Sequence, residues 1–288
     1  MTRRFVRFMI LGSLLLLNLL LLFYSWRRSR NERMVSQDQM DAVLSLYEEK
    51  GVTFAEMPDA VNPGFTALEL KTADVDRMTE RFLGKESFDK SYIYGSKVQY
   101  NSGSITLLTN RPAHTITYTD DSIKAWQAPE DLTEEALFSM LQPLARRFAE
   151  KWLDSVFLSE WRQDDNGYRF IYRQLEGDQI YYFNSISLLV TMDGVKTAVL
   201  TVWEVSAEGR SLVTLPKDEM LYAGLNKMIE LRETPGTIER MYDGYVIDST
   251  ESDGSDETAV AVPVQTMILS SGRTITIRYT GSANAVSP

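Results

Sequence analysis

The sequence of 288 residues contains no cysteine and only one histidine, His114. The missing thiols exclude a disulfide framework, a CxxC redox motif and a thiolate metal site. A single histidine restricts any Ser-His-Asp triad to His114 and excludes a two-histidine metal motif. Because His114 stands at the start of a predicted strand in RPAHTITY, we expect it at a strand edge or on the surface.

Motifs for nucleotide binding and for serine hydrolysis are also missing. The chain has no GxGxxG, no P-loop and no GxSxG. Ser87 and Lys90 have the SxxK spacing, which on a helix would bring a lysine amine toward a serine hydroxyl. However, this stretch follows Gly84, where we expect a loop, and no SDN or KTG element accompanies it. We therefore expect a non-enzymatic protein without cofactor or metal.

Uncharged apolar runs are scarce, and one of them stands out near the N-terminus. Residues 8–26 carry no charge, and as a helix they would extend about 28 Å, close to the hydrocarbon thickness of a bilayer. Tyr24 and Trp26 stand at the end of this run, as interfacial aromatics do. No small-x-small cleavage site follows, so we predict an uncleaved transmembrane anchor rather than a signal peptide.

Basic charge is in short supply beyond this anchor. Seven of the 30 basic side chains and one of the 40 acidic ones lie in residues 1–33, so the remainder carries a net charge of −16. Such a domain repels nucleic acid and anionic lipid. Three arginines precede the run and four follow it, so the positive-inside rule hardly discriminates. A lone N-terminal span followed by a long domain is typical of a signal anchor, which predicts a cytoplasmic N-terminus and an extracytoplasmic domain.

Beyond the anchor, a helix followed by extended segments occurs twice. The first set begins with a helix that opens at Ser36, which forms a capping box with Gln39, and that places Tyr47 on its apolar face. Its other expected elements are helix 74–83 and strands 52–57, 65–70, 92–100, 104–109 and 113–119. The second set begins with a helix capped by Thr133, in which Pro143 predicts a kink or a split. Its other expected elements are strands 168–175, 180–192 and 195–205, helix 217–231, and strands 238–248, 260–269 and 273–279.

This order predicts an α+β protein with a single N-terminal transmembrane helix and two subdomains, each a helix plus an antiparallel meander. We place the cytoplasmic start, the span and the basic juxtamembrane segment in residues 1–33. The N-terminal subdomain is expected over 34–128 and the C-terminal one over 129–288. Alternation in strand 180–192 predicts that one face is core, with these inward side chains: Ile180, Tyr182, Ile186, Leu188, Val190 and Met192.

The stretch YRQLEGDQIYYFNSISLLVTMDG, which begins at Tyr172, resembles the YycI branch of the YycH/YycI family. Gln174, Gly177 and Ile180 stand as in the family, and the anchor sequence LNLLLLFYSW and the closing RYTG are similar more loosely. The basic RRSRNER after the span departs from many members. The resemblance implies a regulator without catalytic residues in a low-GC Gram-positive bacterium. Its implied partners are the cell-wall sensor histidine kinase WalK, also called YycG, and a YycH-like membrane protein.

A single amide, Asn18, interrupts a run of eight leucines within the span. In a bilayer its side chain can be satisfied by a neighbouring helix, which contributes roughly 0.5–2 kcal/mol. We predict a partner-binding face around it, and helical spacing gives its members as Leu11, Leu14, Leu15, Asn18, Leu21, Leu22 and Ser25. In the alternative, Asn18 is only tolerated and faces lipid or its own backbone.

Two functions of different classes follow from these observations. The first is a membrane-anchored regulator of a two-component system that modulates the kinase through helix and ectodomain contacts. The second is an extracytoplasmic binding or scaffold protein for cell-wall polymer or division machinery, which would use its sheets as a platform. A hydrolase that uses Ser87 and Lys90 is a third, weaker interpretation.

Overall fold

The computed structural model describes residues 35–60, 64–84, 87–93, 95–124, 126, 129, 131–212, 214–248 and 257–279. Across these residues the protein is α+β, with four helices and a 14-stranded mixed sheet, which confirms the predicted fold class at this level. The predicted membrane helix over residues 8–26 lies outside them. No helix within the described part is both long and apolar enough to cross a bilayer.

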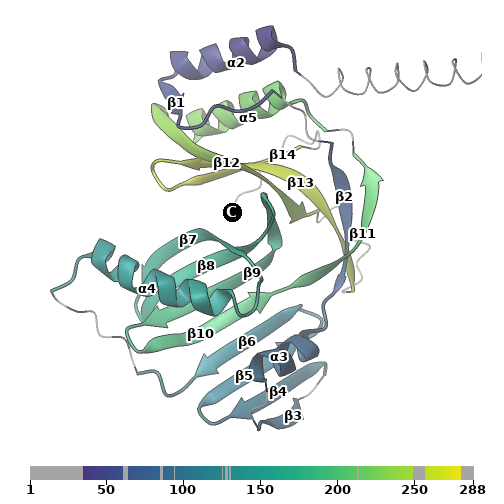
Figure 1. Ribbon diagram of the computed structural model, residues 1–288, viewed down its shortest axis with the longest axis vertical. Coiled ribbons are helices and arrows are strands. Elements are labelled where there is room, and N and C mark those ends of the chain that lie inside the picture. The colour runs from purple at the N-terminus through teal and green to yellow at the C-terminus, as the bar shows by residue number, and fades with distance from the viewer. Residues whose placement is uncertain are drawn as a thin grey trace, which may run out of the picture.

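The elements follow one another along the chain as labelled in Figure 1. The helices are α2 (Gln37–Glu49), α3 (Val75–Leu83), α4 (Glu134–Ala149) and α5 (Lys217–Glu230). The first ten strands are β1 (Val52–Phe54), β2 (Thr66–Thr72), β3 (Asp89–Ile93), β4 (Lys97–Ser102), β5 (Ile105–Asn110), β6 (Thr115–Asp120), β7 (Val156–Asp164), β8 (Gly167–Glu176), β9 (Gln179–Thr191) and β10 (Gly194–Thr201). The last four are β11 (Trp203–Ser211), β12 (Gly236–Ile247), β13 (Thr258–Leu269) and β14 (Thr274–Arg278).

The sheet consists of two halves that differ in their covering helices (Figure 1). The α3–α4 half contains strands β3 to β10, paired antiparallel with α3 and α4 against one face. The α2–α5 half contains β1, β2 and β11 to β14, with α2 and α5 against the face that carries its main core. The halves join where residues 179–181 of β9 pair in parallel with residues 243–245 of β12. The chain also passes directly from β10 through Val202 into β11.

Each half has its own hydrophobic core, which follows from the spacing of apolar residues on the helices. In α4 the buried positions recur every four residues: Leu137, Leu141, Ala145 and Ala149. In α5 the buried apolar side chains are Met220, Leu221, Leu225 and Met228. Full burial of one large aliphatic side chain contributes about 1.5–3 kcal/mol to folding, so burial of these side chains stabilises the packing of both helices on the sheet.

The cores combine segments that are far apart in the sequence. The core of the α2–α5 half joins residues 35–70 to residues 183–279, and that of the α3–α4 half extends from Ala73 to Val202. Both cores therefore draw on each side of residue 128. The division into subdomains 34–128 and 129–288 stays a prediction, and the cores group the segments differently.

Local signals predicted several helix ends correctly. Ser36 and Gln39 form the reciprocal capping box of α2. The Thr133 side chain accepts a hydrogen bond from the backbone of Ala136 at the start of α4. Helix α3 ends at Gly84. These signals act over a few residues, so they do not depend on the rest of the fold.

Four predictions about elements were wrong or incomplete. The strand expected over 92–100 is the hairpin β3–β4, and strand β7 was not predicted. The strand expected over 195–205 is two strands, because β10 pairs with β6 and β9 whereas β11 pairs with β2. Of the kink or split predicted at Pro143, the split is wrong, because helix α4 continues through this residue.

His114 is buried and not at the surface, contrary to the sequence-based expectation. Only 5% of it is exposed, and its ring stacks on Trp203 with centroids 3.6 Å apart. Its φ of 52° places it in the left-handed region, at the turn before β6. This stacking depends on β11, which the sequence did not separate from β10.

The alternation expected along strand 180–192 is interrupted. Arg173 of β8 pairs with Ser185 of β9, but the next residue, Gln174, pairs with Tyr181. Residues 182–184 of β9 are therefore unpaired with β8 and form a bulge. Phe183 is consequently buried in the core of the α2–α5 half. At the far end Met192 is 44% exposed rather than inward.

Candidate functional site

The predicted partner-binding face lies entirely outside the described residues. Its members are Leu11, Leu14, Leu15, Asn18, Leu21, Leu22 and Ser25, all within residues 1–34. The described part of the chain shows a different feature of functional interest, the junction between the halves of the sheet. The stretch from Tyr172 to Gly194 that resembles the YycH/YycI family forms this junction, because it comprises the end of β8, all of β9 and the start of β10.

Gln174 begins a chain of hydrogen bonds that fixes the path between the halves. The Asn184 side-chain amide donates to Gln174 Oε1 at 2.7 Å and to the carbonyl oxygen of Trp203 at 3.1 Å. The backbone N–H of Trp203 donates to Asn184 Oδ1 at 2.6 Å. The backbone N–H of Val202 donates to the carbonyl oxygen of His114 at 3.0 Å. Because Asn184 is buried, these bonds satisfy polar groups that would otherwise destabilise the fold.

Gly177 and Ile180 complete the junction. Gly177 has a φ of 58° in the turn between β8 and β9, a conformation that glycine adopts without steric penalty. Ile180 is fully buried and pairs with Gly244 of β12. A Cβ atom at Gly244 would collide with the carbonyl oxygen of Ile180, so the close approach of β9 and β12 requires glycine there. Gln174, Gly177 and Ile180, on which the resemblance was based, therefore all have structural roles at the junction.

A cleft of about 450 Å³ opens beside the junction, and we call it the inter-half cleft. One wall comes from residues 159–161 of β7 and from Arg173 and Tyr182 of the α3–α4 half. The opposite wall comes from Val246 on β12 and from residues 271–274 and Thr276 at the β13–β14 hairpin. Figure 1 shows these strands facing one another between the halves. The volume of the cleft is in the range typical of small-molecule sites.

Arg173 is the cation held deepest in this cleft. Its Nη1 donates to the carbonyl oxygen of Tyr182 at 3.0 Å, and its guanidinium carbon lies 5.7 Å from the centroid of the Tyr182 ring. Burial lowers the pKa of Arg173, and the negative charge of Glu160 opposes this shift. Its Nε is buried and has no hydrogen-bond partner among the described residues. The guanidinium is therefore desolvated and incompletely paired.

Tyr182 is held in place from the other half of the sheet. Its hydroxyl lies 2.5 Å from Thr266 Oγ1, and that oxygen lies 3.2 Å from Thr276 Oγ1. Burial raises the pKa of Tyr182, so it remains a neutral phenol at physiological pH. The ring is thus a fixed apolar wall with its polar end already satisfied.

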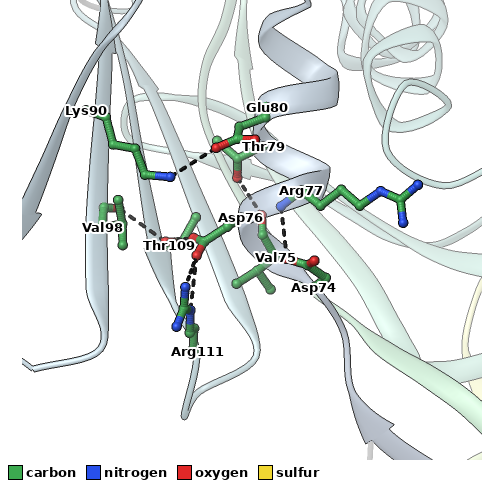
Figure 2. A network of polar contacts seen from close by, with 10 residues as sticks. All are labelled: Asp74, Val75, Asp76, Arg77, Thr79, Glu80, Lys90, Val98, Thr109 and Arg111. Atoms are coloured by element: carbon green, nitrogen blue, oxygen red, sulfur yellow. Dashed lines mark hydrogen bonds and ion pairs between the residues drawn. The ribbon is translucent and has the colours of Figure 1, made fainter.

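A second polar cluster surrounds the start of α3 (Figure 2). Arg111 Nε donates to Asp76 Oδ2 at 3.0 Å, and the Thr109 hydroxyl lies 2.9 Å from Asp76 Oδ1. Burial raises the pKa of Asp76, but the hydrogen bonds from Arg111 and Thr109 and the charge of Arg111 outweigh it and hold the pKa below its usual value. The cluster anchors α3 on β5, so its role is structural.

Ser87 and Lys90 do not form a serine–lysine pair. Lys90 lies in β3, and its amine donates to Glu80 Oε1 at 3.0 Å on α3 (Figure 2). This hydrogen bond raises the pKa of Lys90, so the amine stays protonated at neutral pH and is no general base. Ser87 precedes β3 in a non-helical segment. The helical geometry that the SxxK spacing needs is therefore missing at this position.

The described residues offer binding chemistry more readily than catalytic chemistry. Among them, no group of three or more histidine, aspartate or glutamate side chains is placed to hold a metal ion. The inter-half cleft combines one incompletely paired cation with aromatic and aliphatic walls. Sequence reasoning missed it because Trp161 and Val246 are distant along the chain and no local pattern connects them.

Comparisons with known proteins add little to this geometry. No family model and no curated protein matches the chain. Among solved structures it is similar to an uncharacterized protein from Eubacterium rectale, with a TM-score of 0.45 and 7% identity over 82% of this chain and 89% of that one. It is also similar to the C-terminal domain of YpeB from Bacillus megaterium, with a TM-score of 0.43 and 13% identity over 75% of this chain and 96% of that one. At these scores we base no argument on either likeness.

Proposed function

We propose that the protein is a membrane-anchored, extracytoplasmic regulator in a two-component system, similar to the YycI branch of the YycH/YycI family. Its partners in this proposal are a WalK-like sensor histidine kinase and a YycH-like membrane protein. The anchor spans the membrane once at about residues 8–26, with the N-terminus in the cytoplasm. Residues 34–288 then form the extracytoplasmic part, and no catalysis is involved.

One observation carries the proposal: the stretch that resembles the family forms the junction on which the whole sheet depends. Gln174, Gly177 and Ile180 each have a defined role there, so the likeness falls on residues that specify this architecture. A likeness confined to exposed loops would have much less weight.

The proposed coupling element is the face of the span around Asn18. An amide at the centre of a leucine-rich span is most stable when a neighbouring helix accepts and donates its hydrogen bonds. A shift in this helix packing between two states would carry a signal to or from the kinase. The described chain starts at Val35, next to α2, so the anchor would attach at the α2–α5 half (Figure 1).

The test is co-purification of the kinase with the full-length protein from membranes. We expect Asn18→Leu to leave the protein inserted in the membrane but to recover several-fold less kinase, because the interhelical hydrogen bonds are lost. The matched control is the double variant Asn18→Leu/Leu16→Asn, which keeps the composition and moves the amide about 200° around the helix. Equal recovery of kinase by wild type, Asn18→Leu and the double variant would contradict the coupling role of this face.

The inter-half cleft favours the second candidate, an extracytoplasmic binding protein for cell-wall polymer or division machinery. Its aromatic wall, the ring of Tyr182, is suited to an organic ligand. Wall-polymer binding without recovery of any kinase from membranes would support this function over the regulator.

A further inference from the structure

The inter-half cleft has a charge character that differs from the rest of the molecule. The whole chain has a formal net charge of −10, whereas the charged residues that line the cleft are Arg173, Arg273 and Glu160. Arg273 Nη1 lies 2.8 Å from Glu233 Oε1, so its charge is already neutralised. Arg173 has no ion pair of this kind within the described residues, although Glu160 lies close enough to influence it. The cation available in the cleft is therefore Arg173.

The half-buried guanidinium of Arg173 makes fewer hydrogen bonds within the described residues than its N–H groups could form. Arg173 carries five N–H groups, and its hydrogen bond in the described part of the chain goes to the Tyr182 carbonyl oxygen. A carboxylate is the ligand that fits a guanidinium best, because its two oxygens can accept parallel hydrogen bonds. Such charge-assisted bonds are roughly twice as strong as neutral ones.

The remaining walls fit an apolar group. Val246 and the Tyr182 ring supply apolar surface from opposite halves, and the Tyr182 hydroxyl is occupied by Thr266. The Trp161 ring packs instead on Phe138 and Tyr168, on the face of the sheet that α4 covers. The hydroxyls of Ser159 and Thr276 provide a few polar positions. A pocket of this type binds ligands that combine one charged group with an apolar body.

We propose that the inter-half cleft binds a small organic carboxylate, with the carboxylate on Arg173 and the apolar group against Tyr182 and Val246. The ligand would contact both halves of the sheet at once and would stabilise their relative position. This inference goes beyond the regulatory proposal and does not depend on it. The same chemistry is found in the C-terminal residue of a peptide and in a free aromatic acid.

The test is calorimetric titration of the purified full-length protein with four probes. N-acetyl-Ala-Phe represents a peptide C-terminus and 3-phenylpropionate a free acid, and each is compared with its uncharged amide. We expect at least one acid to bind saturably and about tenfold or more tightly than its amide, since the amide loses the charge-assisted hydrogen bonds. The acid that binds identifies the source. If neither acid binds more tightly than its amide, the proposal is overturned.

Two variants locate the binding in the cleft. Arg173→Met removes the charge at similar length, and Ser159→Trp fills the space between the walls; each should weaken binding of the acid at least about tenfold. Arg146→Met removes an exposed arginine on α4 and should bind like wild type. Thermal melting of every variant checks that it is folded. Should Arg173→Met be unstable, Ser159→Trp still decides, and wild-type affinity in a folded Ser159→Trp variant would overturn the proposal.

Discussion

At the scale of single residues, the buried carboxylate of Asp76 connects helix α3 to the end of strand β5 through hydrogen bonds. Asp76→Asn should lower the free energy of unfolding by about 1–2 kcal/mol at pH 7, because the charge-assisted bonds to Arg111 and Thr109 are lost. The pKa of Asp76 is depressed in the folded state, so its contribution is present above the unfolded value of about 3.9 and is lost as the pH falls through the folded pKa. Urea unfolding at neutral and acidic pH measures both effects.

The matched control is Asp74→Asn, the same substitution two residues earlier. Asp74 accepts a hydrogen bond from the backbone N–H of Arg77 at the start of α3, and asparagine caps helices as well as aspartate does. We expect a change close to zero. Similar losses for Asp76→Asn and Asp74→Asn would show that the ion pair with Arg111 contributes nothing specific.

At the scale of elements, α4 retains a proline that local rules disfavour. Pro143 is exposed in the middle of the helix, where it cannot donate a hydrogen bond to the carbonyl oxygen of Ser139. Pro143→Ala should raise the free energy of unfolding by about 1–2 kcal/mol, since the recovered helix stability exceeds the loss of rigidity in the unfolded chain. Chemical denaturation measures the change. As a control, Arg147→Ala on the same helix keeps every backbone hydrogen bond and should change the free energy of unfolding by less than about 0.5 kcal/mol. A loss of stability in Pro143→Ala would contradict the prediction and would mean that the fold requires the backbone conformation that proline imposes.

Elements were predictable from the sequence where the signal is local or the burial is one-sided. The caps at Ser36 and Thr133 belong to this class. The edge strand β3 was missed because all five of its residues are exposed, which leaves no alternation to detect. The break at Val202 was missed because β10 and β11 differ only in their distant pairing partners.

At the scale of the whole molecule, the two cores share one continuous sheet and should unfold together. Leu141→Ala in the α3–α4 half and Leu225→Ala in the α2–α5 half each remove a side chain that is 3% exposed. Each should lower the free energy of unfolding by about 2–5 kcal/mol and shift the same single transition, because β9 and β12 couple the halves. Differential scanning calorimetry distinguishes this from two transitions, of which each variant would move only one.

The candidate sites were predictable to very different degrees. Asn18 stood out because a polar group in an apolar run is a strong local signal. The inter-half cleft gave no such signal, since Arg173 and Val246 come together only through the pairing of β9 with β12. A cleft between distant segments is a property of the topology and not of any short stretch.

The roles of Gln174, Gly177 and Ile180 also determine what proteins with the same three residues would have in common. A residue that is required for a bulge, a turn or a close contact between strands tolerates few substitutions, and the reason is the fold rather than the function. Proteins gathered by these three positions would therefore share the joint between the halves, while their ligands and membrane partners would be free to diverge. Functional subgroups among them should separate on the cleft-lining residues Ser159 and Arg173, which the joint itself does not dictate.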